Sequence, residues 1–404
     1  MIFVGVDWAE AHHDICVLDE AGVILVRKRI PDTLAGVRTL HELLGDHAEE
    51  PEDVIVGIEK DRGLLVAAML GAHYRVFAIN PLSAARYRER HVTSGSKSDP
   101  GDAKVLADLV RTDRHNHREA AGDSEGAEAL KVLARAHQSA IWARQREANA
   151  LRNALKDYYP GALAAFGTDL DDRDAVAILA VAPTPYLGRQ LSTAKIAAAL
   201  KRAGRTRNLD RRASEIQVAL REEQLTQGPV LEAAYGATTS AHVAMIRAYT
   251  AQIERLEETL AKGFEQHPDA GIVLSLPGMG TILGARVLAE FGDDPNRFSN
   301  AKSRRNYAGT SPITRASGKS HVVLARHMRN RRLADALDQW AFCSLTRSTG
   351  ARAYYDELRG RDKTHRQAIR QLANRWVGIL HACLEQRVDY DETIAWKHRA
   401  DLAA

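Results

Sequence analysis

Three cysteines in 404 residues are too few and too scattered to organise this chain. Cys16, Cys343 and Cys383 are odd in number and far apart, so they form neither a disulfide framework nor a zinc-ligand spacing, which fits a reducing compartment. No apolar run is long enough to cross a bilayer. The N-terminus begins with a strand-like segment and shows no signal peptide. We therefore expect a cytoplasmic protein without disulfides, a zinc site or a membrane partner.

Acidic residues are missing from one long stretch of the chain. The formal net charge is only +4, but from Pro295 to Ala334 there is no Asp or Glu, while ten basic residues occur there: Arg297, Lys302, Arg304, Arg305, Arg315, Lys319, Arg326, Arg329, Arg331 and Arg332. A basic block of this length favours binding to phosphate backbones over a merely solvated face. The candidate nucleic-acid-binding residues are Arg304, Arg305, Arg315, Lys319 and Arg326.

The apolar pattern of residues 1–115 predicts an α/β domain. It indicates strands at Ile2–Asp7, His13–Leu18, Val23–Ile30, Val54–Ile58 and Arg75–Ile79, and helices at Asp32–Leu44, Gly63–Leu70 and Asp99–Arg111. A meander of three strands followed by alternating helix and strand is the order of a ribonuclease-H-like fold. The length of the chain leaves room for further domains.

The rest of the chain is predicted to be mainly helical. Residues 124–268 read as a helical linker and coiled-coil region, with one long helix ended by Pro160 and a later apolar seam at Ile246, Tyr249, Ile253, Leu256, Leu260 and Phe264. That seam fits a coiled coil between subunits or packing within one subunit. Residues 269–400 form the third unit. Gly278-Met279-Gly280 before a predicted helix is weakly typical of a helix–hairpin–helix phosphate site.

Four acidic residues stand where a metal-dependent nuclease would place them. Asp7 and Glu59 each end an apolar strand, and Asp99 and Asp102 stand three apart at the start of a helix. Carboxylates brought together repel one another unless hard cations lie between them, which suits Mg²⁺, with Mn²⁺ as the other candidate. Two such ions support phosphoryl transfer. Asp99 and Asp102 taken alone would more simply be helix-capping residues, but the order of all four favours a metal site.

A serine in the acid-free stretch is the candidate nucleophile. Ser317 precedes a glycine and lies between Arg315 and Lys319, two cations that could hold a phosphate and stabilise developing negative charge. Ser311 and Ser320 are equally plausible on charge alone. An ordinary loop serine is the alternative that the residues leave open.

The combination resembles the DEDD transposases of insertion sequences. The segments Val4-Gly5-Val6-Asp7-Trp8-Ala9, Gly57-Ile58-Glu59, Asn80-Pro81 and Lys97-Ser98-Asp99-Pro100-Gly101-Asp102-Ala103 resemble that family's N-terminal domain, which is similar to the Holliday-junction resolvase RuvC. The segments Leu276-Pro277-Gly278-Met279-Gly280, Tyr307-Ala308-Gly309-Thr310-Ser311-Pro312 and Ser317-Gly318-Lys319 resemble its C-terminal transposase domain. The resemblance covers about residues 1–115 and 270–385. It departs at Lys60-Asp61-Arg62-Gly63, after the glutamate, and in a longer middle region at about 160–235.

The resemblance implies a site-specific DNA recombinase. Asp7, Glu59, Asp99 and Asp102 would coordinate Mg²⁺, and Ser317 would attack DNA to form a covalent phosphoserine intermediate. A structured bridge RNA would pair with donor and target DNA. The protein would act as a homo-oligomer, dimer or tetramer, with composite active sites. It would be cytoplasmic and nucleoid-associated when acting on DNA.

Three other functions compete with this interpretation. A metal-only Holliday-junction endonuclease would use water as the nucleophile. An actin-like or sugar-kinase-like ATPase would need a duplicated α/β half with its own phosphate loop, which the sequence lacks. A regulator that binds nucleic acid without cleaving it would leave the four acids unexplained, since carboxylates repel phosphate when no metal is present.

Overall fold

The computed structural model describes residues 1–91, 99–120, 122–318, 320–326 and 329–403. The chain divides into two compact units, Met1–Gly122 and Asp123–Ala404. The first has a mixed α/β structure and the second is mainly helical, as the sequence predicted. None of the helices in these described ranges is long and apolar enough to cross a membrane.

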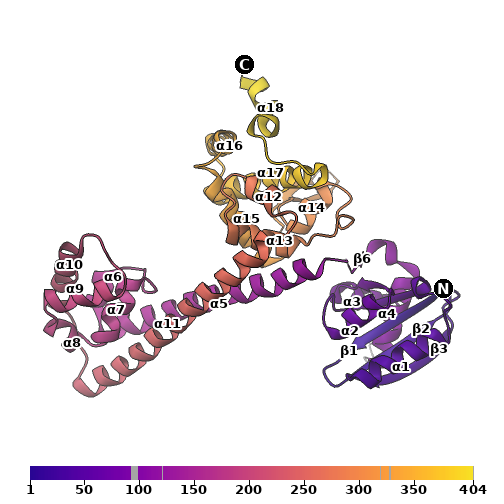
Figure 1. Ribbon diagram of the computed structural model, residues 1–404, viewed down its shortest axis with the longest axis horizontal. Coiled ribbons are helices and arrows are strands. Elements are labelled where there is room, and N and C mark those ends of the chain that lie inside the picture. Colours follow the sequence, from indigo (N-terminus) through magenta and orange to yellow (C-terminus); the bar gives the residue numbers. More distant parts are fainter. Residues whose placement is uncertain (92–98, 121, 319, 327–328, 404) are drawn as a thin grey trace. The chain divides into compact units, whose positions relative to one another are not determined.

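The first unit is built on one mixed sheet (Figure 1). Its strands run in the order β3-β2-β1-β4-β5-β6, with β1 antiparallel to β2 and parallel to β4. The strands are β1 (Ile2–Trp8), β2 (His12–Leu18), β3 (Ile24–Pro31), β4 (Val54–Ile58), β5 (Arg75–Ala78) and β6 (Arg118–Glu119). The helices are α1 (Leu34–Gly45), α2 (Leu64–Gly71), α3 (Pro81–His91) and α4 (Asp99–Thr112), and short 3-10 turns lie at Pro51–Asp53 and Arg114–Asn116. The predicted strands and helices are therefore present with small shifts at their ends.

Two glycines let α4 lie directly on the central strands. A Cβ at Gly5 of β1 would overlap the backbone of Ala103 and Ala107 in α4, and one at Gly57 of β4 would lie 2.6 Å from the carbonyl oxygen of Leu106. Because Gly5 and Gly57 are paired in register, both open the same face of the sheet. The helix backbone can therefore approach the strands more closely than any side chain would allow.

Two long helices form the spine of the second unit. Helix α5 (Glu125–Tyr158) and helix α11 (Pro229–Glu265) lie side by side. They are antiparallel, because partners fall along α11 as they rise along α5: His137 contacts Glu257, whereas Glu147 contacts His242. The predicted seam residues Ile246, Ile253, Leu260 and Phe264 are buried in this unit. The apolar seam therefore packs within its own chain.

A helical module lies between the two long helices in sequence. It consists of α6 (Pro160–Phe166), α7 (Arg173–Val181), α8 (Pro185–Gln190), α9 (Thr193–Arg202) and α10 (Leu209–Arg221), and we refer to residues 160–221 as the insert module. Its helices share a core with the adjoining ends of α5 and α11, which includes Leu155, Ile178, Ile196, Ile216 and Ile246. The module therefore caps one end of the spine (Figure 1).

The remaining helices pack around a second core at the other end of the spine. They are α12 (Ala270–Ser275), α13 (Thr281–Phe291), α14 (Ala301–Ala308), α15 (Arg331–Ser344), α16 (Thr349–Gly360), α17 (His365–Gln386) and α18 (Glu392–Ala403). Trp340 and Trp376 are fully buried at the centre, 5.3 Å apart between ring centroids. A two-stranded hairpin, β7 (Ile313–Ser317) and β8 (Ser320–Leu324), extends from this helical body.

A buried carboxylate ties three parts of this core together. Both oxygens of Glu290 in α13 accept from Arg135 in α5, at 2.8 and 2.9 Å, and one also accepts from Asn330 before α15, at 2.6 Å. Burial raises the pKa of Glu290, but these hydrogen bonds and the charge of Arg135 outweigh it and hold the pKa below its ordinary value. The fold therefore favours the ionised carboxylate of Glu290.

We expect Gly5→Ala to destabilise the first unit by about 1–3 kcal/mol or more, because the new methyl group meets helix backbone that cannot move aside. Gly45→Ala is the matched control, since a Cβ there meets nothing within 4 Å, and it should be neutral or stabilising. Hydrogen exchange of the β1 and β4 amides measures both effects. Equal protection in the two variants would contradict the close packing.

We expect Glu290→Gln to lower the free energy of unfolding of the second unit by about 3 kcal/mol at neutral pH, because it leaves Arg135 without its carboxylate. The folded-state pKa is depressed, so the wild-type advantage is complete above the ordinary value of 4.5 and is lost as pH falls through the folded value. Urea unfolding from pH 7 down to about pH 3 measures it, with the exposed Glu258→Gln as control. A difference that does not depend on pH would refute the argument.

Candidate active site

The first two acids lie side by side at the carboxyl edge of the sheet. In the parallel pair of β1 and β4, Val6 is opposite Ile58, so the next residues along each strand, Asp7 and Glu59, are neighbours. Side chains alternate along a strand, so Asp7 shares the face of Gly5 and points to the side covered by α4. Asp7 is half-buried and Glu59 is exposed. Ligands bind at this edge in open α/β sheets.

The third acid is carried to the same region by α4. Asp102 immediately precedes Ala103, whose carbonyl oxygen lies against Gly5 of β1. Asp102 is 8% exposed, and its Oδ1 forms an ion pair with Arg88 Nη2 of α3 at 2.5 Å. Asp99 is the first residue of α4, but its side chain lies outside the described residues, as do Lys97 and Ser98. Backbone geometry thus groups Asp7, Glu59 and Asp102, and Arg88 neutralises Asp102.

The side chains do not converge into a finished metal cage. Within the described residues no group of three or more His, Cys, Asp or Glu side chains is arranged to hold a metal ion. The chemistry of the donors nevertheless fits a hard divalent cation, since all of them are carboxylates and one is buried against a single arginine. A cation here would replace the guanidinium of Arg88 as the charge that offsets Asp102. Sequence reasoning did not identify Arg88, because it is eleven positions before Asp99 in a helix that the pattern did not predict.

An aromatic side chain lies directly beside the acids. Trp8 follows Asp7 and is 37% exposed, and Lys60, which follows Glu59, places its Nζ 2.6 Å from the centroid of the Trp8 ring. A cation over an indole face is a favourable contact. The pairing ties the end of β1 to the loop after β4. The neighbouring positions of Trp8 and Lys60, each one residue after a predicted catalytic acid, were the available signal in the sequence.

The candidate nucleophile lies at the tip of the hairpin. Ser317 is the last residue of β7 and is opposite Ser320, the first residue of β8, so two residues connect the strands. Gly318 has a φ of +54°, which suits glycine and is typical of tight hairpin turns. Ser317 and Arg315 are exposed, whereas Lys319 lies outside the described residues. The sequence analysis did not predict this hairpin, although two short segments, Ile313–Ser317 and Ser320–Leu324, on either side of a glycine were the available signal.

The basic block separates into structural and exposed members. Arg304 is buried, with its guanidinium 5.3 and 4.8 Å from the ring centroids of Phe291 and Phe298, and burial lowers its pKa to about 10. Its position favours a structural role over contact with nucleic acid. Arg305 and Arg326 are half-buried and Arg315 is exposed. No carboxylate pairs with these three in the part of the chain that the structure describes.

A glycine turn precedes α13 as expected. Gly278 has a φ of +78°, and its missing Cβ leaves room for the backbone of Cys343 and Ser344. Gly280 caps α13 without a side-chain hydrogen bond, so the first amides of that helix are not capped from this position. The turn lines a cavity of about 830 Å³ that also contains Arg347 and Arg352. This geometry suits an oxyanion, although Arg352 already pairs with Asp356 at 2.8 Å.

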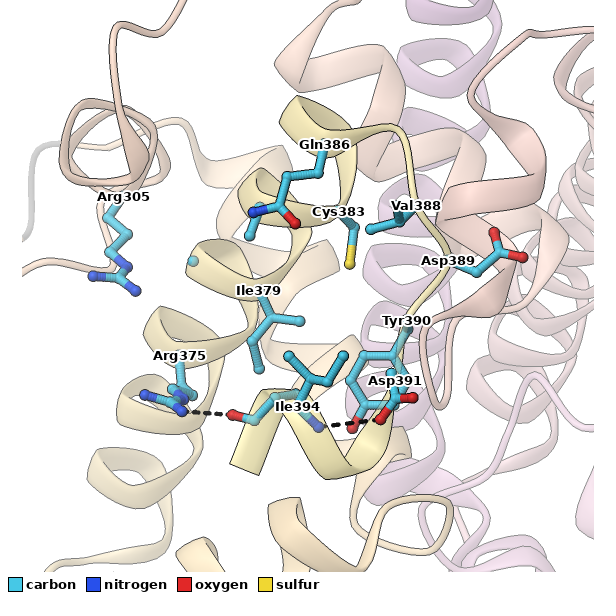
Figure 2. Close-up of a pocket in the computed structure, with 13 residues that line it drawn as sticks. Arg305, Arg375, Ile379, Cys383, Gln386, Val388, Asp389, Tyr390, Asp391 and Ile394 are labelled. Carbon is cyan, nitrogen blue, oxygen red and sulfur yellow. Dashed lines mark hydrogen bonds between the residues drawn. The ribbon is translucent and has the colours of Figure 1, made fainter. Parts of the chain in front are cut away.

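Another pocket in this core has a different character. A cavity of about 290 Å³ lies between α17 and the segment leading into α18. Ile379, Val388 and Ile394 are among the residues that line it (Figure 2). Arg375 reaches across it and donates to the carbonyl oxygen of Ala395 at 2.6 Å. Burial raises the pKa of the Cys383 thiol, which disfavours the nucleophilic thiolate.

The comparisons with known proteins agree with this assembly of features. Residues 4–160 match the family model for DEDD transposases of IS110, described as "Transposase", and residues 270–356 match the model described as "Transposase IS116/IS110/IS902 family". A protein of Streptomyces coelicolor named as the mini-circle transposase for IS117 is 45% identical over 407 residues, which cover 100% of this chain and 98% of the relative.

Two further relatives have lower sequence identity but also match over nearly the whole chain. The 42 kDa protein of insertion element IS900 from Mycobacterium paratuberculosis is 30% identical, over 96% of this chain and 97% of its own length. The 43.6 kDa protein of insertion element IS110 from Streptomyces coelicolor is 28% identical, over 96% and 95%. The chain therefore belongs to the IS110/IS116/IS902 family of transposases, and it is a DNA recombinase enzyme.

Proposed function

We propose that this transposase cuts and rejoins DNA strands with a Mg²⁺ site in its first unit and a serine nucleophile in its second. The first unit would be a RuvC-like, ribonuclease-H-like nuclease domain. Asp7, Glu59, Asp99 and Asp102 would hold one or two Mg²⁺ ions, or Mn²⁺ in their place. Ser317 would be the nucleophile.

The observation that carries the metal proposal is the register of β1 and β4. It sets Asp7 beside Glu59, and the close approach of α4 at Gly5 and Gly57 brings Asp102 to the same edge. Each acid comes from a different element, so the grouping depends on the fold and not on local sequence. When bound, the metal would polarise a phosphoryl oxygen and stabilise negative charge in the transition state.

The serine proposal is supported by the position of Ser317 at an exposed hairpin tip. Its Oγ would lose its proton and attack the phosphorus of a DNA phosphodiester to form the Oγ–P bond. The bond from phosphorus to one sugar oxygen would break, and that oxygen would take up one proton, so that no net proton is gained or lost. Arg315, on the same strand, would hold the phosphate as the charge develops. Lys319 would be a second cation for the phosphate. The phosphoserine keeps the energy of the broken bond available for rejoining.

The proposal also includes the domain division of the chain and the molecules that the protein would bind. We divide the chain into a nuclease domain (1–115), a helical and coiled-coil region (124–268) and a C-terminal transposase domain with a helix–hairpin–helix-like element (269–400). The boundary after the first domain is supported by the two compact units of the chain, whereas the core around Trp340 and Trp376 also includes Leu130, Leu260 and Phe264 of the middle region. The substrates would be donor and target DNA, the guide would be a structured bridge RNA, and the active form would be a homo-oligomer. Exposed Arg315 and half-buried Arg305 and Arg326 would contact nucleic acid.

The second candidate is a metal-only endonuclease that uses water as the nucleophile. The favourable observation is that Glu59 is exposed, with no side-chain partner in the described ranges, and could position a water molecule. In that case Ser317 would be a bystander. The two candidates differ in whether protein becomes covalently attached to DNA.

We expect Ser317→Ala to abolish the covalent protein–DNA species, lowering its rate of formation on the order of 10³-fold or more, because the attacking oxygen is removed. Binding to labelled DNA should be unchanged. Denaturing gel electrophoresis with Mg²⁺ present measures the adduct. Ser311→Ala and Ser320→Ala are the matched controls and should retain it. An adduct of normal yield in Ser317→Ala would refute the serine assignment.

We expect Asp102→Asn to abolish cleavage. Losing a partner outside the direct ligands of a metal already costs about 10–100-fold, so losing a direct ligand should cost more. Cleavage of labelled DNA is measured across a titration of Mg²⁺ and of Mn²⁺. Removal of the metal by a chelator should abolish cleavage by the wild-type protein. Asp108→Asn is the control, because Asp108 lies on the same helix but pairs with Lys104 and Arg111. Full activity of Asp102→Asn would refute the role of the acids.

A further inference from the structure

The insert module has no part in the function proposed above. None of the candidate catalytic or metal-binding residues lies in it, and its helices share a core separate from that around Trp340 and Trp376. A folded element of this size at one end of the spine needs its own explanation.

The module contains a second stretch without acidic residues. From Ala175 to Leu209 there is no Asp or Glu, while six basic residues occur: Arg189, Lys195, Lys201, Arg202, Arg205 and Arg207. The pattern matches that of the block from Pro295 to Ala334. A stretch with one sign of charge creates a local field that attracts a polyanion.

Three arginines converge on one groove in this region. A cavity of about 490 Å³ is lined by Arg173 of α7, Arg202 of α9 and Arg247 of α11. Most of its other lining residues have small side chains, among them Ala177, Ala199 and Ala203. We call this cavity the arginine groove. Small lining side chains let a ligand backbone approach closely, while the arginines supply charge from three separate helices.

The guanidinium groups of the groove carry charge that no acid offsets. Arg173 Nη1 donates to the carbonyl oxygen of Gly204 at 3.1 Å, Arg202 Nε to that of Ala198 at 3.3 Å, and Arg247 Nη2 to that of Val176 at 3.4 Å. Among the described residues, none of the three forms an ion pair with a carboxylate. All three are exposed. Each is thus held in place by backbone and keeps further N–H donors available.

The nearby acids are already engaged. Asp171 pairs with Arg144 at 3.3 Å, and Asp172 caps α7 by accepting from the amide of Asp174 at 2.9 Å. Asp174 is 1% exposed and pairs with Arg205 at 2.6 Å and with Arg212 at 3.8 Å. Asp171 and Asp174 are thus offset by arginines outside the groove, and Asp172 is engaged by a helix amide.

We propose that the arginine groove binds the sugar–phosphate backbone of a nucleic-acid strand. Guanidinium groups form paired hydrogen bonds to phosphate oxygens. The small alanine side chains that line the groove would leave room for a sugar. RNA and DNA share this backbone chemistry, so the experiment includes both. The inference does not depend on the serine chemistry, because it concerns binding alone and can be tested in Ser317→Ala.

The test is binding by the full-length chain carrying Ser317→Ala, with and without Arg173→Gln, Arg202→Gln and Arg247→Gln together. Fluorescence anisotropy with labelled single-stranded RNA, single-stranded DNA and duplex DNA measures affinity at several salt concentrations. We expect the triple variant to bind at least one probe about tenfold more weakly. Its salt dependence should fall by about 2–3 in logarithmic slope, since each phosphate contact contributes about 0.7–0.9.

The matched control removes the same charge elsewhere in the unit. Arg146, Lys156 and Lys262 are exposed and do not line the groove, so Arg146→Gln, Lys156→Gln and Lys262→Gln together should leave affinity and slope nearly unchanged. Loss of equal size in this control would overturn the proposal, as would wild-type affinity of the groove variant for all three probes. Competition by polyglutamate that is as strong as competition by unlabelled nucleic acid would also overturn the proposal.

A second measurement does not depend on the folding of the variant. Photo-crosslinking of the Ser317→Ala chain to RNA and DNA containing thio-substituted bases should label peptides of α7 or α9, as read by mass spectrometry. Crosslinks confined to residues outside the insert module would overturn the proposal. Normal covalent chemistry in the parent chain together with a failed groove test would reject only this inference.

Discussion

The contact between the backbone of α4 and the paired glycines of β1 and β4 sets the geometry of the first unit. Gly5 and Gly57 are opposite one another, and neither position has room for a Cβ beneath the helix. The same contact fixes Asp102 relative to the ends of two strands whose next residues on that face are Asp7 and Glu59. A carboxylate grouping is thus a by-product of helix-on-sheet packing, held in place by backbone atoms and not by flexible side chains.

Much of this arrangement could be predicted from sequence because it has strong periodic signals. The apolar strands Ile2–Trp8 and Val54–Ile58 and the helix Glu125–Tyr158 lie close to where the pattern placed them. The hairpin that carries Ser317 was missed because its strands are almost entirely exposed and lack the apolar alternation of a half-buried strand. The partner of Asp102 was missed for another reason, since Arg88 becomes adjacent only through tertiary packing of α3.

Charge patterns predicted where basic residues gather but not what each one does. Arg297 pairs with Asp123 at 2.5 Å and Arg304 lies between two phenylalanines, so both hold the fold together. Arg315 lies on an exposed strand and forms no ion pair among the described residues. Sequence shows the sign of the charge, whereas burial and partners decide whether it stabilises the protein or remains free for a polyanion. The same distinction separates Arg205, paired with Asp174, from Arg202.

The antiparallel pairing of α5 and α11 has a consequence for how such a chain can vary. Because the chain leaves along one helix and returns along its neighbour, whatever joins their far ends can be enlarged, shortened or exchanged without altering the register of the pair or the core at its near end. The five helices from α6 to α10 share their core with the adjoining ends of this pair, and the core around Trp340 and Trp376 is separate from it. Changes in these five helices could therefore alter what the chain binds while the core around Trp340 and Trp376 keeps its packing.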